Sequence, residues 1–358
     1  MNFYMKKKNS NIYINGRFLA HKTDGISRFS FEICKALKQL NFNFTLIVPN
    51  WLDFENIQNF DIIRFGDLKS HLWEQINLPI FLRKNGSPLL INLSGLGPLY
   101  YKNQIVTIHD VSFYVNAKWF SWTYRLIYAF ATPIVAKSAK TIITVSEFSK
   151  SEIIKYLRLP SFKVQVIYNA VSKDLMKLGS TSQPPYQQEY VLAVASLDPR
   201  KNLQRLVDAF SNSKLKDVTL VLVGKSASHF NFKINNESQN VSFAGHVNDE
   251  QLASLYRNCS LFVYPSLYEG FGIPPLEAMS FKVPVLAADI PSLREVCGQA
   301  VNYFDPYDIE DMATKIVATF VNRTERQRLI MEGDTQVKKY DWIESANKLK
   351  HIIERTIN

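Results

Sequence analysis

Cysteine is scarce in this chain. Only Cys34, Cys259 and Cys297 occur among its 358 residues. Three thiols cannot all pair with one another, and their positions lack the short spacings of metal-ligand motifs. The sequence therefore argues against a disulfide framework and favours a reducing compartment. We expect the three side chains to behave as small buried hydrophobes.

A long apolar run is also missing. An α-helix needs about 20 consecutive apolar residues to cross a bilayer, and the best candidate, residues 122–145, is interrupted by Arg125, Pro133, Lys137 and Lys140. The basic first residues are not followed by the apolar run of a signal sequence. We therefore expect a cytoplasmic protein whose contact with a membrane is peripheral.

Acidic residues are few in the first half of the chain. Residues 1–180 hold 23 Lys and Arg against 11 Asp and Glu, a balance of +12, whereas the remaining residues hold 19 against 21, a balance of −2. This asymmetry suits an N-terminal half that faces an anionic surface, either lipid or nucleic acid. Solubility alone is the alternative explanation.

Residues 118–125 mix aromatic and basic side chains within this positive half. Such a mixture suits a bilayer interface or a stacked base, although an amphipathic helix that packs on its own domain has the same composition. No recognised nucleic-acid motif accompanies the charge, so we expect no nucleic-acid partner.

The three-glycine dinucleotide fingerprint is absent, but strands and helices alternate. A strand at residues 12–14 is followed by a polar loop and then by Gly25, where a helix begins. Apolar residues recur along that helix at Ile26, Phe29, Ile33 and Leu37. Gly25 could bring the helix N-terminus close to a phosphate, or it could be an ordinary loop glycine.

Further alternation indicates an α/β protein with two doubly wound, Rossmann-like parallel sheets. The other predicted strands are residues 44–48, 89–93, 104–108, 141–145, 164–167, 190–195, 219–223, 241–243, 261–263 and 283–287. The later predicted helices are residues 203–210, 250–257, a helix from Pro275, 308–320 and 340–353. Ligands of such sheets bind beyond the carboxyl ends of the strands, so we expect a cleft between the two domains.

A stretch of linker composition lies between Leu178 and Glu189. We place the domain boundary there, with an N-terminal domain at residues 1–180 and a C-terminal domain at residues 186–337. Residues 338–358 form a final helix that either covers one sheet or braces back onto the first domain.

Two glutamates bracket a glycine-rich turn after the strand at residues 261–263. The turn runs from Glu269 through Gly270, Phe271 and Gly272 to a helix that contains Glu277. A helix start next to glycine exposes unpaired N–H groups and attracts phosphate. An ionised carboxylate only accepts hydrogen bonds, so the two glutamates suit sugar hydroxyls. The pattern therefore predicts a nucleotide-sugar site.

Arg200 and Lys201 lie at a strand-to-helix turn early in the second domain. In a diphosphate site they would neutralise the charge that grows as the sugar leaves, a role that metal ions play elsewhere. A solvated turn is the alternative.

His109 follows the predicted strand at residues 104–108 and so lies at the expected cleft. There it could bind a sugar hydroxyl or have a purely structural role. His246, at another strand end, fits a loop residue, and no histidine or cysteine nearby completes a metal site.

Over nearly its whole length the chain resembles the retaining glycosyltransferases of family 4, which have the GT-B fold. The signature is the paired-glutamate segment at residues 269–279. Supporting matches in order and spacing are residues 23–28, 107–110, 145–149, 168–171, 199–203 and 243–245.

The resemblance implies roles for particular residues. Glu277 would hold the ribose hydroxyls and Glu269 the transferred sugar, with the backbone of residues 270–272 beside the donor. Arg200 and Lys201 would grip the diphosphate. Gly25 would contact the phosphates, and His109 would contact the sugar near the reacting carbon. Val247 and its neighbours would line the pocket for the base. The resemblance implies no metal and no cofactor other than the donor itself.

Three features depart from the usual pattern. Ser196 stands where many relatives carry an arginine of the phosphate grip, which leaves that work to Arg200. Asn169-Ala170 replaces the usual Asn-Gly, and Phe281-Lys282 replaces small residues.

The expected function is transfer of a hexose with retention, with mannose from GDP-mannose as the best guess. The expected acceptor is a lipid-linked oligosaccharide of a surface polysaccharide such as O-antigen or capsule. The basic N-terminal domain would then face the anionic inner leaflet of the cytoplasmic membrane. One alternative is a soluble transferase or phosphorylase that uses a non-lipid acceptor, with a UDP-sugar or a dTDP-sugar as the donor of the transferase. The other alternative is a non-catalytic sugar-binding protein.

Overall fold

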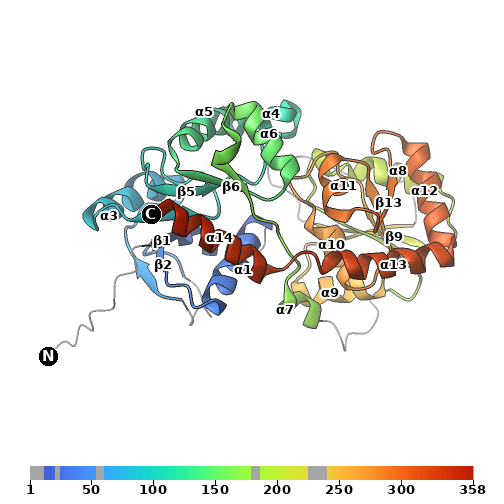
Figure 1. Ribbon diagram of the computed structural model, residues 1–358. Coiled ribbons are helices and arrows are strands. Elements are labelled where there is room, and N and C mark those ends of the chain that lie inside the picture. The colour runs from blue at the N-terminus through green and yellow to red at the C-terminus, as the bar shows by residue number, and fades with distance from the viewer. Residues whose placement is uncertain (1–11, 21–24, 54–59, 179–185, 225–239, 358) are drawn as a thin grey trace.

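The structure is a computed structural model that describes residues 12–20, 25–53, 60–178, 186–224 and 240–357. It contains two parallel β-sheets, each flanked by helices (Figure 1). This arrangement confirms the predicted pair of Rossmann-like domains. Residues 179–185, where the sequence predicts the domain boundary, lie outside the described residues.

The N-terminal sheet has seven strands in the order β3-β2-β1-β4-β5-β6-β7. Its strands are β1 (Ile12–Asn15), β2 (Thr45–Val48), β3 (Ile62–Arg64), β4 (Leu89–Asn92), β5 (Gln104–Thr107), β6 (Thr141–Thr144) and β7 (Val164–Val166). Its helices are α1 (Gly25–Gln39), α2 (Ser70–Leu72), α3 (Leu78–Lys84), α4 (Ser112–Val115), α5 (Trp122–Ser138), α6 (Glu147–Leu157) and α7 (Lys173–Lys177). Short 3₁₀ turns cover Gly16–Ala20, Ala117–Trp119 and Ser161–Lys163, and a π-helical turn covers Trp73–Asn77. The central strands β4 and β5 are buried throughout, as expected for a parallel sheet covered on both faces.

The C-terminal sheet has six strands in the order β10-β9-β8-β11-β12-β13. Its strands are β8 (Tyr190–Val194), β9 (Thr219–Val223), β10 (Val241–Gly245), β11 (Leu261–Tyr264), β12 (Val285–Ala288) and β13 (Asn302–Phe304). The helices that follow β8 are α8 (Leu203–Asn212), α9 (Asp249–Asn258), α10 (Ile273–Ser280), α11 (Pro291–Cys297), α12 (Ile309–Val321), α13 (Arg323–Val337) and α14 (Trp342–Ile357), and a 3₁₀ turn covers Pro199–Lys201. Strand order reverses between β8 and β11, so the segments that follow these two strands emerge beside each other.

Some elements differ from their prediction. The sequence pattern missed the short edge strands β3 and β13 and the helices α11 and α13. Strand β12 begins at Val285, two residues later than predicted, because the preceding turn places Lys282 in the left-handed region with φ of 61°. Ile26 was predicted to join the apolar face of α1, but it is 43% exposed.

The last helix, α14, lies against the first domain rather than the domain that precedes it in sequence (Figure 1). The Trp342 ring packs on Phe29 of α1 at 5.9 Å between centroids. Ser345 Oγ donates to the carbonyl of Tyr168 at 2.7 Å, and Lys140 Nζ donates to the carbonyl of Thr356 at 3.1 Å. The C-terminal helix therefore packs on the N-terminal domain.

Two composition-based expectations can be compared directly with the structure. The three cysteines are free and buried, as predicted, and burial raises the pKa of Cys297 to about 12. Among the residues that the structure describes, no helix is long and apolar enough to span a bilayer.

Candidate active site

Glu269 lies in the loop after β11, with its carboxylate enclosed by three polar groups. Lys201 Nζ donates to Glu269 Oε1 at 2.6 Å, and the buried Tyr264 hydroxyl donates to the same oxygen at 2.8 Å. Burial by itself would raise the pKa of Glu269, but the charges of Lys201 and Arg200 outweigh it, so the pKa is lowered. Burial lowers the pKa of Lys201 despite Glu269. We conclude that the carboxylate is ionised, because two cations face it.

Arg200 of the second domain reaches Asp110 of the first. Its Nη1 lies 3.6 Å from Asp110 Oδ2, and its Nε lies 3.6 Å from Asp198 Oδ2. Asp110 in turn accepts hydrogen bonds from the backbone and the hydroxyl of Ser112. Burial by itself would lower the pKa of Arg200. The negative charges of Glu269, Asp110 and Asp198 have the larger effect and raise that pKa. The guanidinium thus stays charged in a largely enclosed place.

Glu277, on α10, has both oxygens occupied by other side chains. Tyr256 donates to Oε2 at 3.0 Å, and Arg28 Nη1 lies 3.4 Å from Oε1. Arg28 belongs to α1 of the first domain, and its Nη2 also lies 2.7 Å from Asp249. Burial raises the pKa of Glu277, although Arg28 and Tyr256 both act in the opposite direction. A sugar hydroxyl that binds Glu277 would join or replace these two contacts, because each carboxylate oxygen can accept more than one hydrogen bond.

Gly270 is where the second domain touches the first most closely. Its carbonyl accepts hydrogen bonds from Ser146 Oγ at 2.5 Å and Ser149 Oγ at 3.0 Å. A Cβ at this position would lie 2.9 Å from the carbonyl oxygen of His109 and 3.2 Å from Asp110 Cβ. Only glycine lets the two backbones approach this far.

The other residues of the glycine-rich turn have packing roles that their sequence did not reveal. The Phe271 ring is buried and lies 5.5 Å from the Tyr340 ring and 6.1 Å from the Tyr168 ring. Gly272 precedes α10 with φ of 95°, and a Cβ there would lie 2.5 Å from Leu293. Phe271 and Gly272 can therefore offer a ligand their backbone, while their side-chain positions face the protein.

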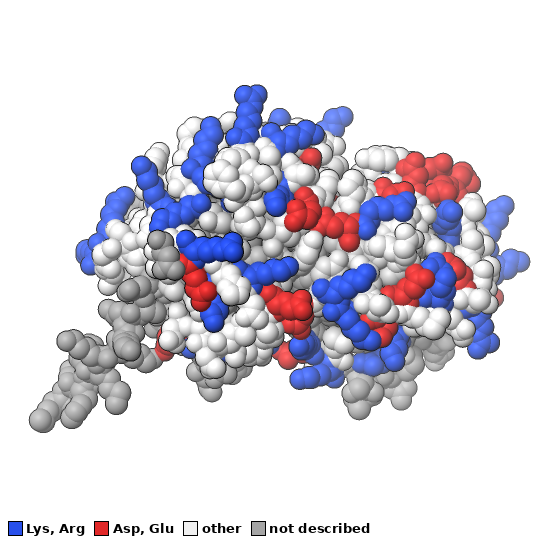
Figure 2. All heavy atoms as spheres, in the orientation of Figure 1, with Lys and Arg blue, Asp and Glu red and all other residues white. Residues whose placement is uncertain are grey.

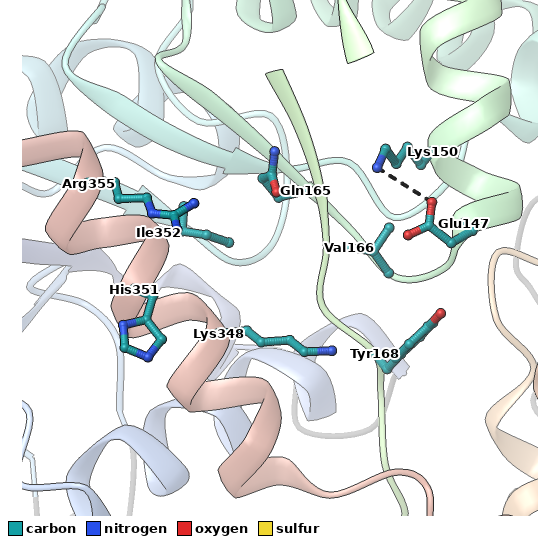
Figure 3. Close-up of a pocket in the computed structure, with 9 residues that line it drawn as sticks. All are labelled: Glu147, Lys150, Gln165, Val166, Tyr168, Lys348, His351, Ile352 and Arg355. Atoms are coloured by element: carbon teal, nitrogen blue, oxygen red, sulfur yellow. Dashed lines mark ion pairs between the residues drawn. The ribbon is translucent and has the colours of Figure 1, made fainter. Parts of the chain in front are cut away.

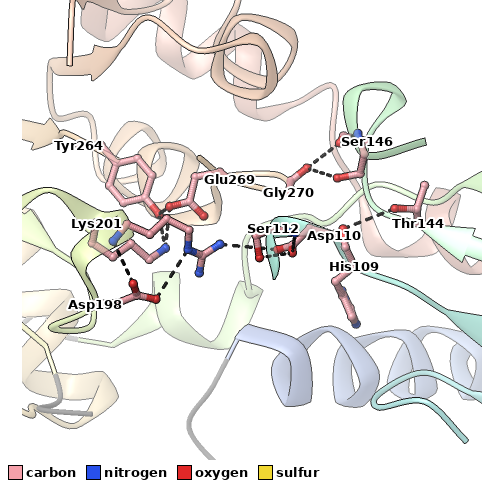
Figure 4. Close-up of polar contacts among 12 residues, drawn as sticks. His109, Asp110, Ser112, Thr144, Ser146, Asp198, Lys201, Tyr264, Glu269 and Gly270 are labelled. Carbon is pink, nitrogen blue, oxygen red and sulfur yellow. Dashed lines mark hydrogen bonds and ion pairs between the residues drawn. The ribbon is translucent and has the colours of Figure 1, made fainter. Parts of the chain in front are cut away.

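His109 points away from the charged cluster (Figure 4). Its Nε2 lies 3.1 Å from the carbonyl oxygen of Leu93, and its ring packs edge-on against Phe29 at 5.1 Å. The side chain that contacts Arg200 is the neighbouring Asp110. In this arrangement His109 contacts α1 and the residue that follows β4, both in its own domain.

Gly25 and Val247 lie at the edges of the site. Gly25 starts α1, and a Cβ there would meet no atom within 4 Å, so the packing of the described residues does not require glycine. Val247 is half-buried in the loop between β10 and α9, two residues before Asp249, which contacts Arg28. Val247 packs against the hydrophobic core.

Within the described ranges, no group of three or more His, Cys, Asp and Glu side chains has the arrangement of a metal site. A pocket of about 410 Å³ is present elsewhere, between α6, β7 and α14 (Figure 3). Its lining carries Lys150, Lys348 and Arg355, and it shares no residue with the charged cluster.

Sequence reasoning missed several residues of this site. Asp110 was quoted only as the neighbour of His109, and Arg28 only as the end of the segment at residues 23–28. The sequence analysis assigned no role to Tyr264 or Tyr256. A tyrosine at the end of a buried strand was the available signal for Tyr264, because a buried hydroxyl needs a partner. For Arg28 the sequence held no signal, since its partners are more than 200 residues away.

The comparisons with known proteins agree with this geometry. Residues 23–175 match the family described as Glycosyltransferase Family 4, and residues 180–336 match Glycosyl transferases group 1. The chain is 30% identical, over 69% of its length and 70% of the relative's, to the O-antigen chain mannosyltransferase B of Escherichia coli. It is 32% identical to the O-antigen chain mannosyltransferase RfbU of Salmonella typhimurium over 58% of each chain.

This chain belongs to glycosyltransferase family 4. The fold agrees: the sucrose-phosphate synthase of Thermosynechococcus elongatus superposes with a TM-score of 0.77 over 97% of this chain and 98% of that one, at 18% identity. The GT-B architecture predicted from the sequence is therefore confirmed, and the enzyme is a glycosyltransferase.

The close contact at Gly270 predicts the effect of a methyl group there. Gly270→Ala should destabilise the glycosyltransferase by about 1–3 kcal/mol, because the nearest atom is a backbone oxygen that cannot move aside cheaply. Urea unfolding measures the change. Gly25→Ala is the matched control, expected within about 0.5 kcal/mol of the parent because its Cβ meets nothing. Equal unfolding midpoints for the two variants would contradict the close contact.

The Arg28–Glu277 pair predicts a stability loss that depends on pH. Arg28→Ala should cost on the order of 1–3 kcal/mol at neutral pH, because Glu277 stays buried without its cation. The pKa of Glu277 is raised in the folded state, so the folded protein holds the Glu277 proton more tightly than the unfolded chain does. This contribution to the free energy of unfolding is fully present below the unfolded pKa of about 4.3 and is lost as the pH rises through the folded pKa. The deficit should therefore shrink on acidification, which thermal unfolding between neutral and mildly acidic pH would measure.

Glu277→Gln supplies the control for this pH dependence. In that background the effect of Arg28→Ala should be small and nearly independent of pH. A deficit of the same size in both backgrounds would show that the ion pair does not couple the two domains.

Proposed function

We propose that the enzyme transfers mannose from GDP-mannose to a lipid-linked oligosaccharide during synthesis of a surface polysaccharide, with retention at the anomeric carbon and without a metal ion. The observation that carries the proposal is the meeting of Lys201, Glu269, Arg200 and Glu277 at the domain junction. The mannosyl group and the polysaccharide come from the names of the relatives, which are O-antigen mannosyltransferases.

The charged cluster suits a nucleoside diphosphate sugar. Arg200 and Lys201 would hold the diphosphate, Glu269 the hydroxyls of the mannose, and Glu277 the ribose hydroxyls. Each of these groups already contacts another side chain. The donor would therefore bind beside or in place of the contacts made by Asp110, Glu269 and Arg28. Gly25 at the start of α1 and Val247 in the loop before α9 would complete the donor site.

The chemistry follows from this placement. The bond between the anomeric carbon and the phosphate oxygen breaks, and the acceptor oxygen forms a bond on the same face of the sugar. The acceptor proton passes to the leaving diphosphate. Arg200 and Lys201 would stabilise the negative charge that grows on the diphosphate, in a buried place where such stabilisation is strong. No covalent sugar adduct on a side chain is needed.

The N-terminal domain would dock on the anionic inner leaflet of the cytoplasmic membrane. Helix α5 exposes Trp122 (75%), Leu126 (63%) and Phe130 (67%) on successive turns of one face. Figure 2 shows mainly Lys and Arg side chains along the edge where Figure 1 draws α5. Apolar side chains between basic ones suit an anionic lipid surface, which is where a lipid-linked acceptor is found.

Thermal unfolding with a panel of nucleotides tests the donor. GDP and GDP-mannose should stabilise the enzyme, by about 2.7 kcal/mol at a concentration one hundred times Kd. Lys201→Ala should reduce this stabilisation, and Glu269→Ala should abolish mannose transfer to membrane-derived acceptor while GDP still binds.

Different outcomes of that panel separate the alternatives. If UDP or dTDP stabilises the enzyme more than GDP does, the donor carries uracil or thymine instead of guanine. If no nucleotide stabilises the enzyme, the proposal is overturned. Near-normal transfer by both variants would refute the site.

Sedimentation with vesicles tests the membrane surface. Phosphatidylglycerol vesicles should retain the enzyme at low salt and release it at high salt, because screening weakens the attraction. Trp122→Ser with Phe130→Ser should bind less. Met331→Ser, which removes an equally exposed apolar side chain from α13, is the control. Equal retention on phosphatidylcholine would contradict the proposal.

A further inference from the structure

The open edge of the N-terminal sheet forms the floor of the pocket of about 410 Å³ between α6, β7 and α14. Among the described strands β7 pairs only with β6, so its other side has no neighbouring strand. Helix α6 forms one wall of the pocket and α14 forms the other (Figure 3). The pocket therefore lies where the C-terminal helix passes the edge of the first domain.

Basic side chains from both walls line this pocket. Lys150 comes from α6, and Lys348 and Arg355 come from α14. Figure 3 shows Lys348 and Arg355 extending from α14 toward β7. The lining holds one carboxylate, Glu147, which lies 3.5 Å from Lys150 Nζ. With His351 neutral, the lining therefore carries three positive charges and one negative charge.

Two of these cations have no carboxylate partner. Lys348 and Arg355 form no ion pair with any residue that the structure describes, whereas Lys150 on the facing wall forms one. Glu344 precedes Lys348 by four residues on α14, a spacing that favours an ion pair. The Lys348 ammonium instead lies over the Tyr168 ring, 5.3 Å from its centroid. The charge of Lys348 is thus directed into the pocket.

This arrangement favours an anionic ligand. A cleft lined by one sign of charge concentrates counter-ions, because the like charges add to one another inside it. Guanidinium and ammonium groups both bind phosphate oxygens, and a guanidinium can do so with two parallel hydrogen bonds. A phosphate between Lys348 and Arg355 would supply the negative charge that no described carboxylate supplies to them.

The pocket is larger than a bare phosphate ion needs. Its volume lies within the range of roughly 300–1,000 Å³ that is usual for small-molecule sites. Val166 of β7, Ile352 of α14 and the ring of Tyr168 add apolar surface to the lining. Such a lining suits a phosphate group that is attached to a small organic molecule.

The pocket adjoins the domain junction but is separate from the donor site. The backbone N–H of Glu147, at one edge of the pocket, donates to Glu295 of the second domain at 2.8 Å. The Tyr168 ring, at another edge, lies 6.1 Å from the ring of Phe271 in the glycine-rich turn. The four charged residues assigned to the donor do not line the pocket. A ligand bound here therefore leaves the donor site open.

We propose that this pocket is a second ligand site, which binds a soluble small molecule that carries a phosphate monoester. Lys348 and Arg355 hold the phosphate, and Lys150 approaches it from the facing wall. A monoester carries nearly two negative charges at neutral pH, which balances the excess of two positive charges in the lining. The organic part lies on Val166 and Ile352. The inference is independent of the proposed transfer reaction, because no residue assigned to that reaction takes part.

Isothermal titration with ribose 5-phosphate tests the site. The parent enzyme should bind it, ribose should not bind, and added salt should weaken the binding because screening weakens the attraction. Lys348→Gln with Arg355→Gln should raise the Kd at least tenfold. The matched control is Lys338→Gln with Lys350→Gln, which removes the same charge outside the lining and should change the Kd less than twofold. Lys348 and Arg355 are exposed, so urea midpoints should match the parent.

Lys201→Ala separates this site from the donor site. Binding of ribose 5-phosphate should survive this change. No binding by the parent enzyme, or binding that Lys201→Ala abolishes and the pocket variant keeps, overturns the inference. Retention on phosphatidylglycerol vesicles that the pocket variant loses, without binding of ribose 5-phosphate by the parent, assigns the phosphate to a lipid head group and also overturns it. A parent enzyme that binds ribose 5-phosphate but no nucleotide fails the proposed function instead.

Discussion

The site depends on the close approach of the Gly270 backbone to the first domain. The carbonyl of Gly270 accepts hydrogen bonds from two serines at the start of α6, and Glu295 of α11 accepts from the backbone N–H groups of Glu147 and Phe148 on the same helix, each at 2.8 Å. These contacts bring α1 and Asp110 within reach of Arg200 and Glu277. Without them, the charged residues of each domain would lack their partners in the other.

Charge balance explains how the domain junction tolerates several buried ionised side chains. In the described structure Glu269 contacts Lys201, Asp110 contacts Arg200, and Glu277 contacts Arg28. Buried charges are tolerated because each has an opposite charge nearby. In the proposed donor complex, phosphate oxygens would pair with the cations and sugar hydroxyls would donate hydrogen bonds to the carboxylates.

Most of the architecture could be predicted because burial leaves a local pattern. Strands such as Leu89–Asn92 and Leu261–Tyr264 are short apolar runs, and α8 and α9 repeat their apolar residues with helical spacing. The edge strands β3 and β13 were missed, whereas β7, equally short and also at a sheet edge, was predicted. In the site, Arg200, Lys201 and the paired glutamates were found from their motif, whereas Arg28 and Asp110 act through partners distant in sequence.

The sequence by itself determined the two parallel sheets, the family and the chemical types gathered at the glycine-rich turn, because periodicity and short motifs are local properties of the chain. Only the tertiary structure decided which charges meet. Phe271 turned out to pack on Tyr340, His109 to face α1, and Arg28 to reach Glu277 across the junction. The physical reason is that a side chain's direction is set by the packing of elements that lie far apart in sequence, which no local pattern records.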